Sequence, residues 1–159
     1  MDNHYFSKWL RFNDRNEFNK IGWEFPGVYA IAYTEENLSN KKYNLIKDIV
    51  YFGMTNSIAG LKGRLDQFSN TIYEKRTQHG GAERFCHNLS KEDKNWKDKL
   101  YVSIMIFHDC DVKSNKPNDL LIMGDVAKQE YICWAQYVEK FNVMPRFNDK
   151  KNNPKKDKK

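Results

Sequence analysis

Two charged side chains fall where a purely structural role would be unusual or costly. Glu130 lies three residues after Ala127 and four before Trp134, within the apolar face of a helix that the periodicity predicts. Because a glutamate is almost never fully buried without a partner, this carboxylate needs a counter-charge, which a metal ion or Arg64 would supply. Arg64 borders an apolar stripe itself, so its guanidinium either reaches solvent or points into a cleft beside the sheet.

Two tyrosines lie on neighbouring predicted strands. Tyr29 follows Gly27 by two residues, and Tyr51 precedes Gly53 by two. A glycine inside a strand costs stability and often marks the close approach of a backbone or ligand. The two phenols could point to one side of the sheet and act on a common substrate. The simpler alternative is that tyrosine favours strands, and the chain has nine of them.

Apolar periodicity and turn residues predict the elements that must hold these side chains. An amphipathic N-terminal helix is expected within residues 1–24, and Pro26-Gly27 ends it. Strands are expected at 27–33, 46–54 and 100–107, and helices at 58–72 and 119–140. The polar stretch 74–96 contains Gly80-Gly81, which favours a loop or an unusual backbone conformation. The fold class is therefore α+β, with a three-stranded, mainly antiparallel sheet flanked by helices.

Charge and composition narrow the classes of protein. The 159 residues carry a formal net charge of +6, but the last twelve contribute six lysines against two aspartates. The rest of the chain is therefore close to neutral, and the basic end is expected to be a disordered tail that adds non-specific attraction to phosphate. The longest apolar run is far too short to span a membrane, and no secretory signal is expected. Three cysteines without a CxxC pair favour a reducing, cytoplasmic setting.

Five elements in order resemble the GIY-YIG nuclease family. Gly27-Val28-Tyr29 and Tyr51-Phe52-Gly53 are similar to its two signature strands, and the helix with Arg64 follows them. The helix with Glu130 and the closing segment 145–148 resemble the last two elements. The resemblance covers about residues 25–148, which gives three parts: an N-terminal helical extension (1–24), a GIY-YIG-type domain (25–148) and a basic tail (149–159).

The resemblance implies roles for these residues in phosphodiester hydrolysis. Glu130 would hold one divalent ion, Mg²⁺ or Mn²⁺, and Arg64 would bind the scissile phosphate. Tyr29 would orient or deprotonate the attacking water with help from Tyr51, although either tyrosine could be the base. A tyrosine with a pKa of ~10 needs a nearby cation to act as a base, and the metal and Arg64 would lower its pKa. Gly53 and Asn148 would support the site.

The sequence departs from the family pattern in ways that affect the site. The signature tyrosines are 22 positions apart, so the hairpin loop must be enlarged. Many members have a histidine or tyrosine one helical turn after the arginine, where this chain has Phe68, and many have a lysine where it has Met54. We hypothesise that His79 replaces the missing imidazole.

Other basic and metal-ligating side chains give two further expectations. The candidate nucleic-acid-binding residues are Lys62, Arg64, Lys75, Arg76 and Arg84. A zinc site built from Cys86, His87, His108 and Cys110 has suitable ligand types, but the spacings do not fit a structural zinc motif.

The leading hypothesis is a metal-dependent endonuclease acting on DNA, of restriction or repair type. A homodimer would let a small enzyme cut both strands. The alternative is a catalytically weakened module of the same fold that binds nucleic acid or a protein.

Overall fold

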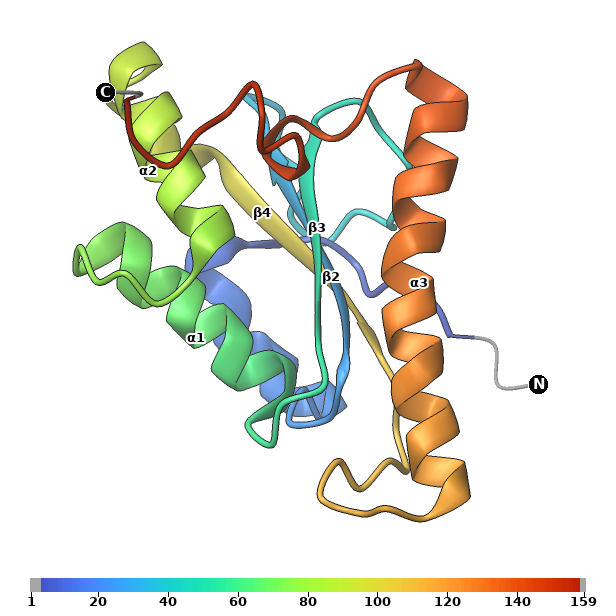
Figure 1. Ribbon diagram of the computed structural model, residues 1–159. Coiled ribbons are helices and arrows are strands. Elements are labelled where there is room, and N and C mark those ends of the chain that lie inside the picture. The colour runs from blue at the N-terminus through green and yellow to red at the C-terminus, as the bar shows by residue number, and fades with distance from the viewer. Residues whose placement is uncertain (1–3, 158–159) are drawn as a thin grey trace.

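The computed structural model describes residues 4–157, and an antiparallel sheet with helices on both faces forms its centre (Figure 1). Strands β2 (Gly27–Tyr33), β3 (Ile49–Thr55) and β4 (Leu100–Ile106) correspond to the three predicted strands. A fourth strand, β1 (Leu10–Arg11), pairs with β4 and completes the order β1-β4-β2-β3. The α+β class is confirmed. The expected count of three strands is wrong by one, because two residues are too few to show strand periodicity.

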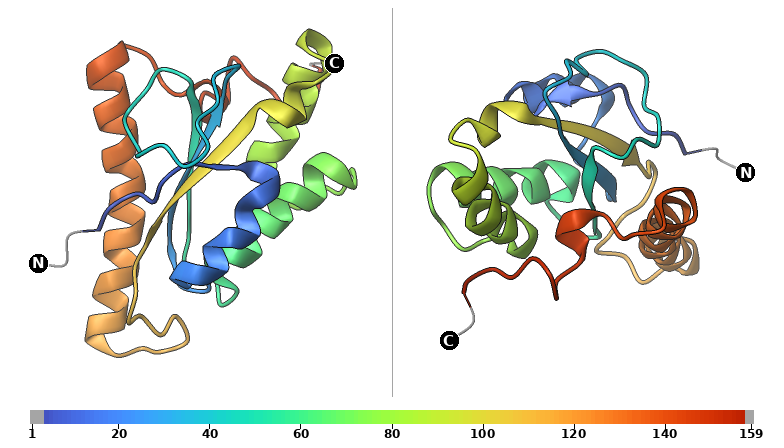
Figure 2. Two further views of the ribbon diagram at one scale, coloured as in Figure 1. Left: turned by 180° about the vertical axis from the view of Figure 1, so that it is seen from behind. Right: turned by 90° about the horizontal axis from the view of Figure 1, so that it is seen from above.

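Helices cover the two faces of the sheet unequally (Figure 2). The helices α1 (Gly60–Tyr73) and α2 (Gly80–Glu92) pack on one face with the 3-10 helix η1 (Phe12–Ile21), and α3 (Pro117–Phe141) packs on the other. Short 3-10 turns, η2 (Trp96–Lys99) and η3 (Arg146–Asn148), precede β4 and follow α3. Each face therefore has its own apolar core, and β2 is buried on both sides, which explains its nearly continuous apolar sequence.

Two expectations about helices differ from the structure. In the N-terminal segment, Trp9 is extended and exchanges backbone hydrogen bonds with the 40–41 loop, and the helix begins later, at Phe12. The stretch predicted as a polar loop contains α2, whose first residues are Gly80 and Gly81. Neither glycine is among the residues of positive φ. A Cβ at Gly81 would lie 2.7 Å from the Tyr51 ring, so this glycine permits close packing of α2 on β3 rather than a turn.

The register of the hairpin decides which side chains share a face. Tyr29 pairs with Gly53 and Ile31 pairs with Tyr51 in the antiparallel β2–β3 ladder. Because side chains alternate along a strand, Tyr29 and Tyr51 lie on the same face, diagonally across the pair. That face is the one covered by α1 and α2.

The chain after α3 crosses the end of β3 and runs to α2, as the red segment in Figure 1 shows. Residues 149–157, for which the sequence predicts a disordered tail, lie along α2 in the structure. Asn88 donates a hydrogen bond to the carbonyl of Pro154 at 3.1 Å, and Lys155 pairs with Glu83 at 3.1 Å. Side chains of this segment therefore come close to the face that carries the tyrosines.

Candidate active site

The ring of Tyr29 lies across Gly53, and this contact requires a glycine. A Cβ at Gly53 would be 2.3 Å from both Cζ and Oη of Tyr29, well inside the contact distance of any two heavy atoms. Tyr29 is fully buried, and its ring centroid is 6.0 Å from that of Tyr51. The glycine that costs strand stability thus creates the space in which the Tyr29 hydroxyl is held.

The hydroxyl of Tyr29 lies 2.6 Å from Nε2 of His79, which is also buried. His79 is the N-cap of α2, and its Nδ1 accepts the backbone N–H of Ala82 at 3.2 Å. A neutral imidazole that accepts at Nδ1 carries its proton on Nε2. By this argument His79 donates its hydrogen bond to the Tyr29 oxygen, and a donated hydrogen bond favours the tyrosinate form.

Phe68 on α1 packs against His79 at the start of α2. Phe68 lies one turn after Arg64, and its ring centroid is 5.0 Å from that of His79 in an edge-on arrangement. The apolar ring packs against the imidazole, while Thr71 accepts the backbone N–H of His79 at 3.1 Å. His79 belongs to the start of α2, so the spacing of residues within α1 could not have indicated its position.

Burial controls the protonation of the tyrosine–histidine pair. Desolvation, and secondarily the charge of Arg64, lower the pKa of His79 to about 3, so the imidazole is neutral at pH 7. Burial raises the pKa of Tyr29 well above its usual value, and the Arg64 guanidinium acts in the opposite direction without prevailing. Arg64 by itself therefore does not lower the pKa of Tyr29 below its usual value, and the sequence-based expectation requires the metal as well.

Arg64 is electrostatically coupled to every titratable side chain of this group. Its charge opposes the rise in pKa of Tyr29, Tyr51 and Glu130, and it depresses the pKa of His79. The guanidinium is half-buried and donates one hydrogen bond, from Nη1 to Gln67 Oε1 at 3.0 Å. Because a guanidinium has five N–H donors, others remain available for an anion that enters the site.

Glu130 lies on α3, in the layer opposite the tyrosines, and its charge acts on Tyr51. It is half-buried on α3, and burial raises the pKa of its carboxyl to about 7, against the charges of Arg64 and Lys150. Among residues 4–157 no hydrogen bond or ion pair to this carboxylate is found. A desolvated carboxylate without a partner fits the binding of a hard divalent cation, which would be completed by water and substrate oxygens.

Asn148 holds the edge strand in place. Its side-chain amide accepts the backbone N–H of Phe52 at 2.8 Å and donates to the Phe52 carbonyl at 2.9 Å. These two bonds satisfy edge groups of β3 that no neighbouring strand reaches. Asn148 thus supports the strand between Tyr51 and Gly53 rather than contacting the tyrosine rings through its amide.

The basic residues proposed for nucleic-acid binding separate into two groups. Arg84 donates a hydrogen bond to the carbonyl of Gly80 at 3.0 Å, next to His79, and its charge acts on Tyr51 and His79. Lys62 instead pairs with Asp66 at 3.0 Å, and Arg76 pairs with Glu74 at 2.8 Å. Lys75 is exposed in the loop before α2. Arg84 thus lies at the start of α2, Lys75 and Arg76 share a surface pocket with Lys155, and Lys62 lies on α1.

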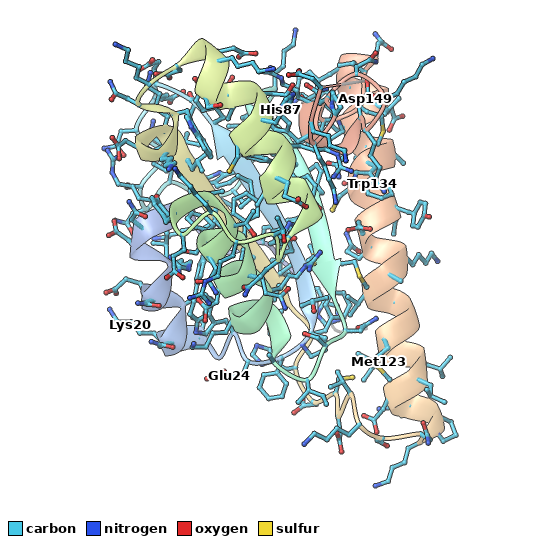
Figure 3. The ribbon with its side chains drawn as sticks, turned by 60° about the vertical axis from the view of Figure 1, so that its left-hand side comes forward. Lys20, Glu24, His87, Met123, Trp134 and Asp149 are labelled. Atoms are coloured by element: carbon cyan, nitrogen blue, oxygen red, sulfur yellow. The ribbon has the colours of Figure 1, made fainter. Side chains whose placement is uncertain are left out.

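Two lysines near the site were missed by sequence reasoning. Lys150 opposes the rise in pKa of Glu130, and Lys155 helps to lower that of His79. Both lie in the stretch interpreted as a tail, which is composed mainly of lysine, asparagine and aspartate and has no apolar periodicity that would predict a fixed structure. Figure 3 shows Asp149, next to Lys150, in the segment that follows α3, at the same end of the molecule as Trp134.

The zinc alternative receives no support from the arrangement of its residues. Cys86 and His87 lie on α2, whereas His108 and Cys110 follow β4. In the part of the chain that the structure describes, no three His, Cys, Asp or Glu side chains gather as a potential metal site.

Comparison of the chain with family models, with curated proteins and with solved structures finds no match. The helices formed by residues 4–157 include none with the length and apolar character needed to span a membrane.

Proposed function

We propose that this chain is a metal-dependent endonuclease of the GIY-YIG type that hydrolyses phosphodiester bonds in DNA. The observation that supports this proposal best is the buried Tyr29–His79 hydrogen bond, with the charges of Arg64 and Glu130 acting on the tyrosines. These residues come from a strand, a helix cap and two helices on opposite layers. A structural role alone does not account for a buried hydroxyl–imidazole pair beside an unpaired carboxylate and a partly free guanidinium.

The proposed reaction begins with the scissile phosphate beside Arg64, where the guanidinium binds two of its oxygens and stabilises charge that develops on them. A divalent cation held by Glu130 would act as a Lewis acid on a phosphate oxygen and on the leaving group. Binding of substrate and metal would release the Tyr29 proton to solvent, and His79 would stabilise the resulting tyrosinate through its Nε2–H. This tyrosinate would orient the attacking water and take its proton, and the leaving oxygen would take a proton from solvent. Because His79 is neutral and Nδ1 is occupied, it acts here as a hydrogen-bond donor rather than as the base.

Tyr51 lies next to Tyr29 and is positioned by the close packing of Gly81. Burial raises the pKa of its hydroxyl too, so both phenols are protonated before substrate and metal arrive. The positive charge of a bound metal would lower the pKa values of both tyrosines. A tyrosinate base would therefore form only when the metal and the substrate are bound. In this way the resting protein avoids burying a phenolate without a counter-ion.

A binding module without hydrolysis is the second candidate. The raised pKa of Tyr29 favours it, because ionising this buried tyrosine is costly without a bound cation.

The three cysteines are all free thiols, which fits the proposed cytoplasmic setting. DNA of restriction targets and DNA of repair intermediates are both compatible with this site, and a homodimer would allow cleavage of both strands.

The decisive experiment compares plasmid cleavage with and without Mg²⁺ for the parent, Glu130→Ala and Glu139→Ala. Glu139 lies on the same helix but is exposed, so its substitution removes an equal charge without touching the site. Removing the metal-holding carboxylate should lower the rate by about 10²-fold or more, as expected for the loss of a transition-state interaction. Glu139→Ala should cleave at the parent rate. Equal cutting by the parent and Glu130→Ala would overturn the enzymatic proposal, and retained DNA binding would then favour the binding module.

A further inference from the structure

The segment that follows η3 is fastened to the body of the protein by asparagine and arginine side chains. Asn153 is buried, accepts a hydrogen bond from Arg146 Nε at 3.2 Å and donates one to the Arg146 carbonyl at 2.8 Å. Arg146 also forms a two-pronged ion pair with Glu92 on α2. The side-chain oxygen and the NH₂ group of the buried Asn153 are both hydrogen-bonded. These bonds fix the path of the segment, although its composition is that of a disordered tail.

The path brings Lys155 against the first turn of α2. Its ammonium pairs with Glu83 at 3.1 Å and would lie 2.8 Å from a Cβ at Gly80, the residue next to His79. The absence of a side chain at Gly80 therefore leaves room for this lysine. An ammonium has three N–H donors, and the pair with Glu83 uses one of them, so Lys155 can also donate to an anion.

Lys150 is an exposed residue at the start of this segment. It follows Asn148 by two residues, and Asn148 is bonded to the backbone of Phe52 between Tyr51 and Gly53. No ion pair to Lys150 is found among residues 4–157, although its charge acts on Glu130. The closing segment therefore carries one cation near the carboxylate and a second near the histidine.

We infer that residues 149–157 form a wall of the active site, and that Lys150 and Lys155 bind backbone phosphates next to the scissile one. The inference rests on the proposed function for the identity of the ligand, a phosphodiester strand. Lys155 lies against Gly80, next to the His79 that bonds to Tyr29, and Lys150 follows the Asn148 that holds β3. The segment thus acts at the site of reaction, and not merely as a basic tail that attracts nucleic acid from a distance.

The chain contains a matched control for this inference. Lys151 and Lys156 are exposed neighbours in the same segment, and no ion pair to either is found in the described residues. Full-length Lys150→Gln/Lys155→Gln and Lys151→Gln/Lys156→Gln proteins lose the same charge from the same stretch. Binding of a fluorescent DNA duplex is measured in Ca²⁺ across a salt series, and cleavage is measured in Mg²⁺ at saturating DNA.

We expect the Lys150/Lys155 variant to bind about tenfold or more weakly than the control variant and to lose close to two units of salt-dependence slope. Its cleavage rate at saturation should also fall, while the control should keep the parent rate. Equal losses of affinity and slope in the two variants would overturn the inference and leave a general electrostatic tail. Asn153→Ala keeps every lysine, so a binding defect like that of the Lys150/Lys155 variant supports the fixed path, and parent-like binding contradicts it.

These outcomes separate the inference from the proposed function. If the parent binds DNA but does not cut it, the enzymatic proposal fails, and the comparison of binding still decides the role of the lysines. If the parent does not bind the duplex in the salt series, the proposed ligand is wrong and both proposals fall.

Discussion

Substitution of Gly53 by alanine tests whether the space beneath Tyr29 is essential. The added Cβ would be 2.3 Å from Cζ and Oη of Tyr29. Since non-bonded heavy atoms settle at about 3.5 Å, the ring or the strand must move by about 1 Å. Tyr29 cannot yield easily, because it is fully buried and bonded to His79 at 2.6 Å.

The expected size of the effect follows from this overlap. Overpacking of a filled core costs about 1–3 kcal/mol of unfolding free energy. A misplacement of about 1 Å at a reacting group can lower the rate by about 10²-fold. Gly53→Ala should therefore be less stable in urea unfolding and should cleave plasmid about two orders of magnitude more slowly.

Gly124→Ala is the control for this substitution. Gly124 is an interior residue of α3, and a Cβ there would meet nothing within 4 Å. Alanine should therefore stabilise the helix by about 0.5–1 kcal/mol and leave cleavage unchanged. If Gly53→Ala matched the parent in both stability and rate, the close packing of Tyr29 on Gly53 would be refuted.

Two further predictions concern titration. The pKa of His79 is lowered to about 3 in the folded protein. Between about pH 6.5 and pH 3, His79 is therefore protonated in the unfolded chain but neutral in the folded protein. The stability present above pH 6.5 is therefore lost as the pH falls toward 3, by up to about 1.4 kcal/mol per pH unit, and His79→Gln should flatten this part of a urea-unfolding series. A variant with the parent's slope would contradict a buried, neutral imidazole. The pKa of Glu130 is raised to about 7, so Mn²⁺ must displace a proton at lower pH. Its affinity, measured by calorimetry, should rise about tenfold per pH unit up to about 7 and then level off, and an affinity independent of pH would exclude Glu130 as the ligand.

Local sequence patterns were sufficient for three of the four strands and for two of the helices. Alternating and continuous apolar runs defined β2, β3 and β4, and the stripe of Leu61, Leu65 and Phe68 defined α1. These elements bury apolar faces, and burial leaves a period in the sequence. The helix α2 was missed, because its mixed polar composition and leading Gly80-Gly81 pair suggested a loop, although it buries Phe85 and Leu89.

The sequence by itself singled out Tyr29, Tyr51, Arg64 and Glu130 as side chains with unusual positions, and it suggested His79. It could not show that His79 bonds to Tyr29, because the two are fifty residues apart and meet through the packing of α2 on β3. It also could not show that Lys150 and Lys155 lie near these side chains. Their placement depends on a buried Asn153 and on the Arg146–Glu92 pair, which are long-range contacts without periodicity. Residue type limits the chemistry that a side chain can do, whereas tertiary packing decides which of them are desolvated together, and desolvation sets their pKa values.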